Sequence, residues 1–94
     1  MKALTEVEIA DFLTQTPDWI LADGKLVREW RFKDFVAAME FVNQVAALAE
    51  EAGHHPDIDI RYNRVRLGLV THDAGGITAR DAAMAGKLSE ELSG

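Results

Sequence analysis

The sequence predicts a two-layer α+β fold in which helices cover one face of a four-stranded antiparallel sheet. Two pairs of alternating apolar and polar segments each contain a short turn signal, Asp23-Gly24 in the first pair and Asn63-Arg64 in the second. Segments with helical periodicity precede, separate and follow these pairs. The expected order is therefore α-β-β-α-β-β-α. A chain of 94 residues has room for one core, so we expect a single domain over residues 1–94.

The first helix is expected to begin directly after Thr5. Thr5 and Glu8 have the spacing of a capping box, in which each residue satisfies a free backbone amide of the other. The helix should run to about Gln15 and end before Pro17, because the residue before a proline is held out of the helical conformation.

The first hairpin is predicted over residues 19–22 and 25–32. Asp23-Gly24 is a strong signal for a two-residue turn, because both central positions need a positive φ. Ala22 then lies opposite Lys25. One face carries Trp19, Leu21, Leu26, Trp30 and Phe32, interrupted by Arg28. Ile20 and Val27 pair on the other face, which leaves that face partly apolar and open to a further partner.

A long helix is predicted over residues 35–52, capped by Asp34 and ended by Gly53 in a left-handed conformation. Its apolar residues form two adjacent stripes. The first contains Phe35, Ala38, Met39, Val42, Ala46 and Ala49, and the second contains Phe41, Val45 and Leu48. An apolar arc this wide predicts two partners, the sheet and a second subunit, and hence a homodimer or homotetramer.

The second hairpin is predicted over residues 58–62 and 65–71. A two-residue turn at Asn63-Arg64 would place Tyr62 opposite Val65, and the apolar residues of both strands would then share one face. Continued beyond the strand ends, this register would place His55 opposite His72. The hairpin therefore predicts that distant histidines converge.

A loop over residues 73–76 is expected to lead into the last helix. Thr78 and Asp81 again have the capping-box spacing, and Ile77 and Ala82 are placed as a hydrophobic staple. The helix should run to about Leu92. Its inward residues are predicted to be Ala85, Leu88 and Leu92.

The composition excludes several classes of protein. Ten basic against sixteen acidic residues give a net charge of -6, which disfavours a nucleic-acid-binding surface. No apolar run is long enough to span a membrane, and the first residues do not read as a secretory signal. Cysteine is absent, so neither a disulfide nor a thiolate nucleophile is available. We therefore expect a cytoplasmic protein that binds neither nucleic acid nor membrane.

His54, His55 and His72 are the three histidines of the chain, and three interpretations compete for them. They could be surface residues at loop ends. They could bind a metal, although the spacing matches no zinc signature and adjacent residues of an extended chain point to opposite sides. They could also perform acid-base chemistry, because imidazole titrates near neutral pH. Glu50 lies one turn before His54 and is placed to orient that imidazole. We expect no metal at this site.

The spacing of these residues resembles the signature of the pterin-4a-carbinolamine dehydratases. The pattern is Glu50-x-x-x-His54-His55-Pro56, followed by Tyr62, His72 and Asp81, and the agreement extends over nearly the whole chain from Trp19 onward. Animal members of the family also serve as the dimerisation cofactor of a homeodomain transcription factor. Asp73 departs from the pattern conservatively, because family members often have Glu there.

The resemblance implies a hydro-lyase that removes water from 4a-hydroxytetrahydropterin to give quinonoid dihydropterin. Such an enzyme recycles the tetrahydrobiopterin-type cofactor of an aromatic amino acid hydroxylase. The developing cation is delocalised over the pterin ring, so the reaction requires neither a cofactor nor a metal. The alternative from a different class is a protein-interaction module or transcriptional coactivator with the same fold.

The resemblance also implies roles for individual residues. The residues matching His54 and His72 look like the acid-base pair, and the one matching His55 looks like a substrate orienter. The implied substrate contacts are Gly53, His54, His55, Val70, Thr71, His72, Asp73 and Trp19, with Glu50 and Asp81 in support. For Trp19, core packing is an equal alternative. For Asp81, a helix cap is favoured over direct catalysis. Tyr62 is expected to pack on its sheet face, and Arg80 to be solvated or ion-paired.

Overall fold

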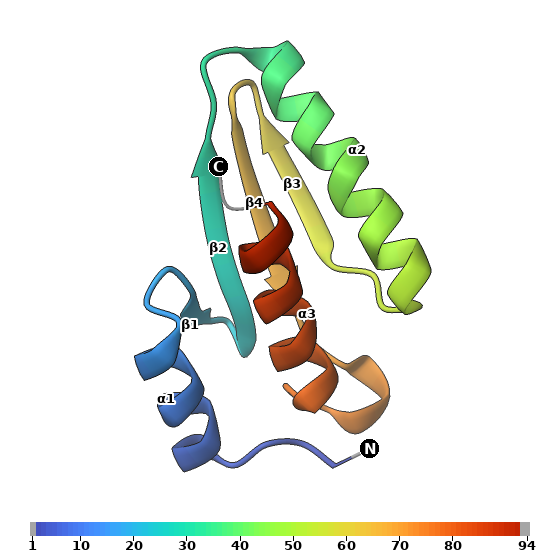
Figure 1. Ribbon diagram of the computed structural model, residues 1–94. Helices are drawn as coiled ribbons and strands as arrows, with labels where there is room; N and C mark the ends of the chain where they lie inside the picture. The colour runs from blue at the N-terminus through green and yellow to red at the C-terminus, as the bar shows by residue number, and fades with distance from the viewer. Residues whose placement is uncertain (1, 93–94) are drawn as a thin grey trace.

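The computed structural model describes residues 2–92 and has the predicted order of elements (Figure 1). The helices are α1 (Glu6–Gln15), α2 (Phe35–Ala52) and α3 (Ala79–Glu91). The strands are β1 (Ile20–Ala22), β2 (Lys25–Arg31), β3 (Asp57–Arg61) and β4 (Arg64–Leu69). A short 3-10 turn, His72–Ala74, lies between β4 and α3 and overlaps the loop predicted over residues 73–76. The two-layer α+β prediction is confirmed.

The four strands form one antiparallel sheet in the order β1-β2-β4-β3. The first hairpin has the predicted register, with Ala22 opposite Lys25. Asp23 and Gly24 have φ values of 54° and 74°, as the two-residue turn requires. The Asp-Gly pair alone therefore predicted this register.

The second hairpin differs from the prediction by two residues. Its turn is Tyr62-Asn63, with Arg61 opposite Arg64, and Tyr62 has a φ of 54°. The Asn63 side-chain amide donates to the Phe32 carbonyl, and the Phe32 amide donates to the Asn63 carbonyl, both at 2.8 Å. These bonds to the chain beyond β2 hold the turn. Because the shift is an even number of residues, the faces stay as predicted, but Tyr62 is an exposed turn residue and does not pack on the sheet.

Helices α2 and α3 cover one face of the sheet, and the core lies between these helices and the sheet (Figure 1). The buried residues of α2 are Ala38, Phe41, Val42, Val45 and Ala49. Both predicted stripes therefore contribute to the core, and only Phe35 and Ala46 of the first stripe are exposed. Val27 was predicted to add to the open apolar surface, but it is only 5% exposed and does not. Among the helices of residues 2–92, none combines the length and apolar character needed to cross a membrane.

Both capping boxes are present. Thr5 accepts from the Glu8 amide at the start of α1, and the Thr5 backbone bond to the Glu8 carboxylate lowers the pKa of that carboxyl. Asp34 caps α2 through the Ala37 amide, and Gly53 ends α2 with a φ of 65°. These signals explain why the predicted starts of α1 and α2 agree with the structure.

Candidate active site

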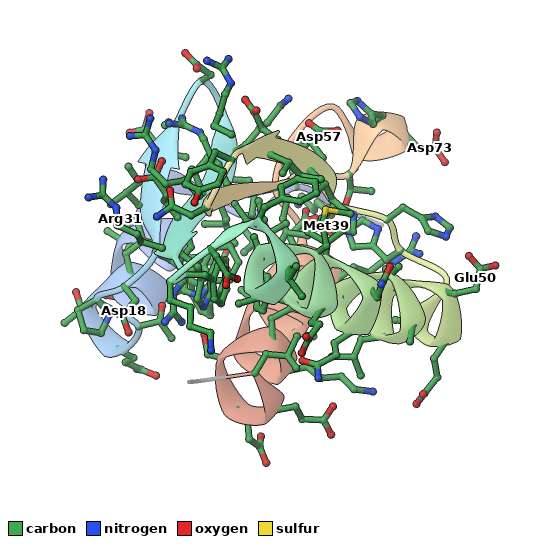
Figure 2. The ribbon with its side chains drawn as sticks, turned by 90° about the horizontal axis from the view of Figure 1, so that it is seen from above. Asp18, Arg31, Met39, Glu50, Asp57 and Asp73 are labelled. Carbon is green, nitrogen blue, oxygen red and sulfur yellow. The ribbon has the colours of Figure 1, made fainter. Side chains whose placement is uncertain are left out.

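All three histidines line one pocket of about 310 Å³. It lies where the end of α2, the end of β4 and the start of α3 meet. The pocket is lined by Gly53, His54, His55, Val70, Thr71, His72, Asp73 and Arg80. Figure 2 labels Glu50 on α2 and Asp73 on the turn after β4, which lie toward the same side of the molecule. Seven of the eight predicted substrate contacts therefore border the same space.

The histidines converge by a route other than the predicted one. Strand β3 begins at Asp57 and β4 ends at Leu69, so no strand ladder reaches His55 or His72. Gly53 instead turns the chain out of α2, where the His54 amide still donates to the Ala49 carbonyl at 3.2 Å. The 3-10 turn brings His72 to the same pocket from the other strand. A helix end and a tight turn thus do what the hairpin register was expected to do.

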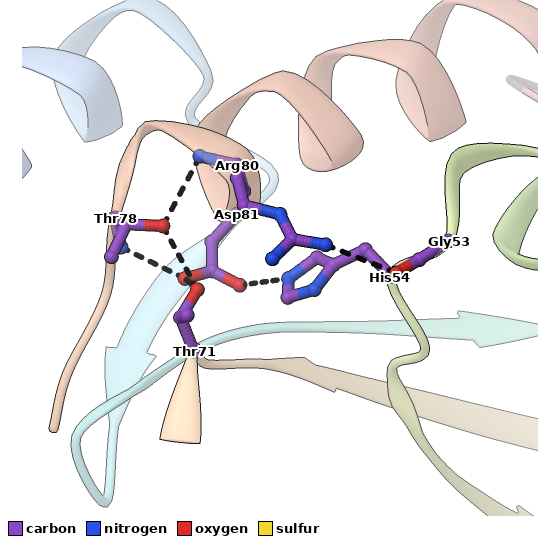
Figure 3. A network of polar contacts seen from close by, with 6 residues as sticks. All are labelled: Gly53, His54, Thr71, Thr78, Arg80 and Asp81. Atoms are coloured by element: carbon purple, nitrogen blue, oxygen red, sulfur yellow. Dashed lines mark hydrogen bonds and ion pairs between the residues drawn. The ribbon is translucent and has the colours of Figure 1, made fainter. Parts of the chain in front are cut away.

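His54 is held by a buried carboxylate. Its Nε2 lies 2.5 Å from Oδ1 of Asp81, and the two side chains are 11% and 0% exposed (Figure 3). Oδ2 of Asp81 accepts from the Thr78 amide and from the Thr71 hydroxyl, each at 2.8 Å. Asp81 therefore caps the helix, which was the role favoured from the sequence. Its other carboxylate oxygen is the partner of His54.

This contact fixes the chemistry available to His54. A carboxylate can only accept, so Nε2 of His54 must carry a proton. In the neutral imidazole the lone pair is then on Nδ1, which becomes the nitrogen able to accept a proton. The arrangement is that of a carboxylate that orients a general base and stabilises the imidazolium formed when it takes a proton.

Glu50 was expected to orient His54, and that prediction is wrong. Oε2 of Glu50 lies 3.0 Å from Nε2 of His55 instead. The reason is the left-handed turn at Gly53, after which His54 is directed to α3 while His55 stays beside the last turn of α2. Both partners of the Glu50–His55 contact are exposed, at 83% and 63%, so it contributes little to stability.

Trp19 does not line the pocket. It is 2% exposed, its ring is in edge contact with Trp30 at 5.9 Å between centroids, and its indole nitrogen donates to the Ser89 hydroxyl at 2.8 Å. The alternative of core packing is therefore correct for this residue. A tryptophan at the start of a strand has the same sequence signal in either role, so only the packing could decide.

Two residues have contacts that the sequence did not predict. Arg80 lines the pocket, and its Nη2 donates to the Gly53 carbonyl at 3.0 Å, which joins the start of α3 to the end of α2. Thr71 lines the pocket too, but its hydroxyl is committed to Asp81 and lies 2.8 Å from the Thr78 hydroxyl. The sequence signal that could have placed Arg80 at the pocket was its position directly before the capping Asp81.

Comparison with known proteins agrees with this geometry. The family model for pterin 4 alpha carbinolamine dehydratase matches residues 2–91. A relative named pterin-4-alpha-carbinolamine dehydratase in Chloroflexus aurantiacus is 59% identical, covering 96% of this chain and 97% of that protein. A relative of the same name in Acidobacterium capsulatum is 58% identical, covering 98% of this chain and 100% of that protein.

Solved structures show the same fold. The transcriptional coactivator/pterin dehydratase from Brucella melitensis is similar, with a TM-score of 0.87 and 38% identity over 95% of this chain and 97% of that one. A pterin dehydratase-like RuBisCO assembly factor of the alpha-carboxysome has a TM-score of 0.61 at 23% identity, which shows a shared fold only. With a family model that spans nearly the whole chain and relatives close to 60% identical, this chain belongs to the pterin-4a-carbinolamine dehydratase family.

Proposed function

We propose that this chain is a hydro-lyase that removes water from 4a-hydroxytetrahydropterin. The observation that carries the proposal is that His54, His55 and His72 line one pocket, with His54 held by the buried carboxylate of Asp81. Membership of the dehydratase family supports the same activity. The product would be the quinonoid dihydropterin, returned to the cofactor pool of an aromatic amino acid hydroxylase.

The reaction needs one proton donor and one proton acceptor. The C4a–O bond breaks and the hydroxyl leaves as water once it is protonated. The N5–H bond also breaks, and its electron pair forms the N5=C4a double bond. One proton is given and one is taken, so the number of protons on the protein is unchanged, and the donor and the acceptor return to their starting states by exchange with solvent. Imidazole suits both steps because it titrates near neutral pH.

The contacts support different roles for the three histidines. His54, with its proton on Nε2, has Nδ1 free to take the N5 proton, and Asp81 stabilises the resulting imidazolium. His72 is exposed on the 3-10 turn and would donate to the leaving hydroxyl. His55, beside Glu50 at the pocket edge, would position the pterin. Gly53, Val70, Thr71 and Asp73 would form the surrounding wall.

The direct test is a stopped-flow assay with chemically generated 4a-hydroxytetrahydropterin. The purified chain is expected to accelerate dehydration above the rate in buffer alone. A rate equal to that of buffer, with protein in excess over substrate, would remove the proposal. The interaction-module alternative is not favoured, because a module that only binds protein has no use for three histidines around one pocket.

Replacing His55 by Ala is expected to raise KM several-fold and leave kcat nearly unchanged. An orienting contact is present in both the ground state and the transition state, so its loss weakens binding without slowing the chemical step. Steady-state kinetics corrected for the buffer rate measure this. Glu50→Gln is the matched control and should change KM less, because the Glu50 carboxylate is 83% exposed. A fall in kcat at constant KM would show that His55 takes part in the chemistry.

We also propose that the chain forms a homo-oligomer. Phe35 and Val36 at the start of α2 are 49% and 63% exposed, and Ile20 and Leu21 of β1 are 55% and 51% exposed. Light scattering at micromolar concentration should give a multiple of the 10.4 kDa chain mass. Phe35→Ser with Val36→Ser should lower that mass if α2 forms the contact. A wild-type particle of chain mass would contradict the proposal.

Residues 1–94 are proposed to act as one domain, since the family model spans 2–91. A cytoplasmic location is proposed because the chain has no cysteine and therefore depends on no oxidising compartment.

A further inference from the structure

The sheet face opposite α2 and α3 carries a concentration of arginines. Trp30, Ile60 and Val65 point toward the helices, so the residue next to each of them in its strand points to the other face. Four of the six arginines in the chain lie there, Arg31, Arg61, Arg64 and Arg66, and all four are exposed. The chain as a whole has a net charge of -6, so this clustering runs against its overall balance.

Three of these arginines form a row across three adjacent strands. Arg64 of β4 lies directly opposite Arg31 of β2 on one side and Arg61 of β3 on the other. Neighbouring strands are about 4.8 Å apart, so the three guanidinium groups start from backbone positions within about 10 Å. Like charges directly opposite each other destabilise a sheet. The fold therefore keeps an unfavourable row of positive charge on an open surface.

The next row carries both signs of charge and pairs with only one arginine of the first row. It consists of Glu29, Arg66 and Asp59. Asp59 pairs with Arg61 at 3.2 Å. Within residues 2–92, no carboxylate oxygen lies within 4.0 Å of a guanidinium nitrogen of Arg31, Arg64 or Arg66.

A hollow accompanies the row. Arg61, Arg64 and Arg66 line a pocket of about 220 Å³ together with Glu29 and Asp59. Guanidinium groups bind phosphate through pairs of parallel N–H donors, which favours arginine over lysine for this purpose. The two carboxylates border the cationic row on one side and would repel an anion that extended past it. The site therefore fits a short anion of high charge.

We propose that the row Arg31-Arg64-Arg61 binds a compact polyanion, a chain of two or three linked phosphates. The site is separate from the histidine pocket, with which it shares no lining residue, and the proposal does not depend on the dehydratase activity. Nucleic acid is the disfavoured ligand, because a long strand would meet Glu29 and Asp59 and the negative charge of the whole chain.

Calorimetric titration with inorganic tripolyphosphate at low salt tests the site. The full chain is expected to bind, and Arg64→Gln should weaken binding at least ~10-fold because it removes the central guanidinium. The affinity of Arg64→Lys should lie between those of the wild-type chain and Arg64→Gln, since lysine keeps the charge but loses the paired donors. Lys2→Gln changes the net charge equally and should bind like wild type, because the segment before α1 lies at the far end of the molecule from the β3–β4 turn (Figure 1).

Thermal unfolding shows whether the variants are folded. Arg64→Gln should have an unchanged or higher Tm without ligand, because it relieves the repulsion across the row. If Arg64→Gln unfolds, Arg31→Gln at the end of the row carries the same expectation for binding. Equal weakening by Lys2→Gln, or no wild-type binding at millimolar tripolyphosphate, would overturn the proposal.

Further titrations distinguish the source of the phosphates. Pyrophosphate should bind more weakly than tripolyphosphate, and a nucleoside triphosphate should bind comparably if the phosphate chain alone is recognised. A single-stranded oligonucleotide should bind more weakly than tripolyphosphate, and Glu29→Gln should narrow that difference by removing a bordering charge. An oligonucleotide that bound more tightly than tripolyphosphate to the wild-type chain would replace this proposal with a nucleic-acid surface.

Discussion

Replacing both His54 and His72 by Ala should reduce the dehydration rate to nearly that of buffer, whereas each single replacement should cost only about 10²-fold. Both imidazoles line the same pocket, so we expect either one to perform part of the proton transfers proposed for the other. The double variant has no such substitute, and its loss should be larger than the single losses indicate. Stopped-flow kinetics with the same protein preparations would measure all three variants.

This prediction needs two controls, a measurement of pterin binding by each variant and a measurement of the uncatalysed rate in buffer. Pterin binding should survive in the double variant, because His55, Gly53 and the wall of the pocket remain. The uncatalysed reaction proceeds at a measurable rate, so each variant must be compared with buffer. A double variant that kept full activity while His55 was intact would refute the assignment of His54 and His72 as the acid-base pair.

Replacing Asp81 is expected to have two separable effects, on folding and on rate. Asp81→Ala removes the helix cap and leaves the Thr78 amide and the His54 Nε2–H without their acceptor in a buried place. The loss of the capping bond to the Thr78 amide costs about 1 kcal/mol, and the unsatisfied His54 Nε2–H costs about 1–3 kcal/mol. We therefore expect the free energy of unfolding to fall by about 2–4 kcal/mol, measured by urea denaturation.

Asp81→Asn separates the two effects. Its carbonyl oxygen can still accept from the Thr78 amide, so most of the stability should remain. Its amide group then faces Nε2 of His54 and donates a hydrogen bond, which moves the imidazole proton to Nδ1. The nitrogen that should take the substrate proton is then occupied, and the rate should fall by about 10²-fold, as in His54→Ala.

A double-mutant cycle sharpens this expectation. If Asp81 acts only through His54, then Asp81→Asn should add almost nothing to the rate loss of His54→Ala. Full additivity of the two losses would show that Asp81 acts on the substrate by another route. An Asp81→Asn enzyme with wild-type rate would show that the tautomer of His54 does not matter.

The helix boundaries could be predicted because local signals determine them. Asp34 and Gly53 mark the two ends of α2, and Phe35–Ala52 matches the prediction at both. The strand register of the second hairpin could not be predicted in the same way. Asn63 is a favourable turn residue in either register, and the choice depends on its bonds to Phe32, 31 residues earlier in the chain.

Most of the residues that border the pocket could be predicted from the sequence, but the hydrogen-bond partners of the histidines could not. The spaced pattern of histidines can be read directly from the sequence, and it identified most of the residues around the pocket. The partner of His54 depends on the direction in which the chain leaves α2, and that direction follows from a single left-handed residue, Gly53. Two carboxylates were available, Glu50 four residues away and Asp81 far along the chain, and tertiary packing selects the distant one.

The sharing of Asp81 between the start of α3 and His54 has a consequence for motion. If the first turn of α3 opens locally, the carboxylate that holds His54 leaves with it, so only molecules with an intact first turn would hold the proposed base in place. The Asp81 and Ala82 amides donate to the Thr78 carbonyl in that turn. Their hydrogen-exchange protection would therefore report the fraction of molecules that is competent for proton transfer, without any substrate present.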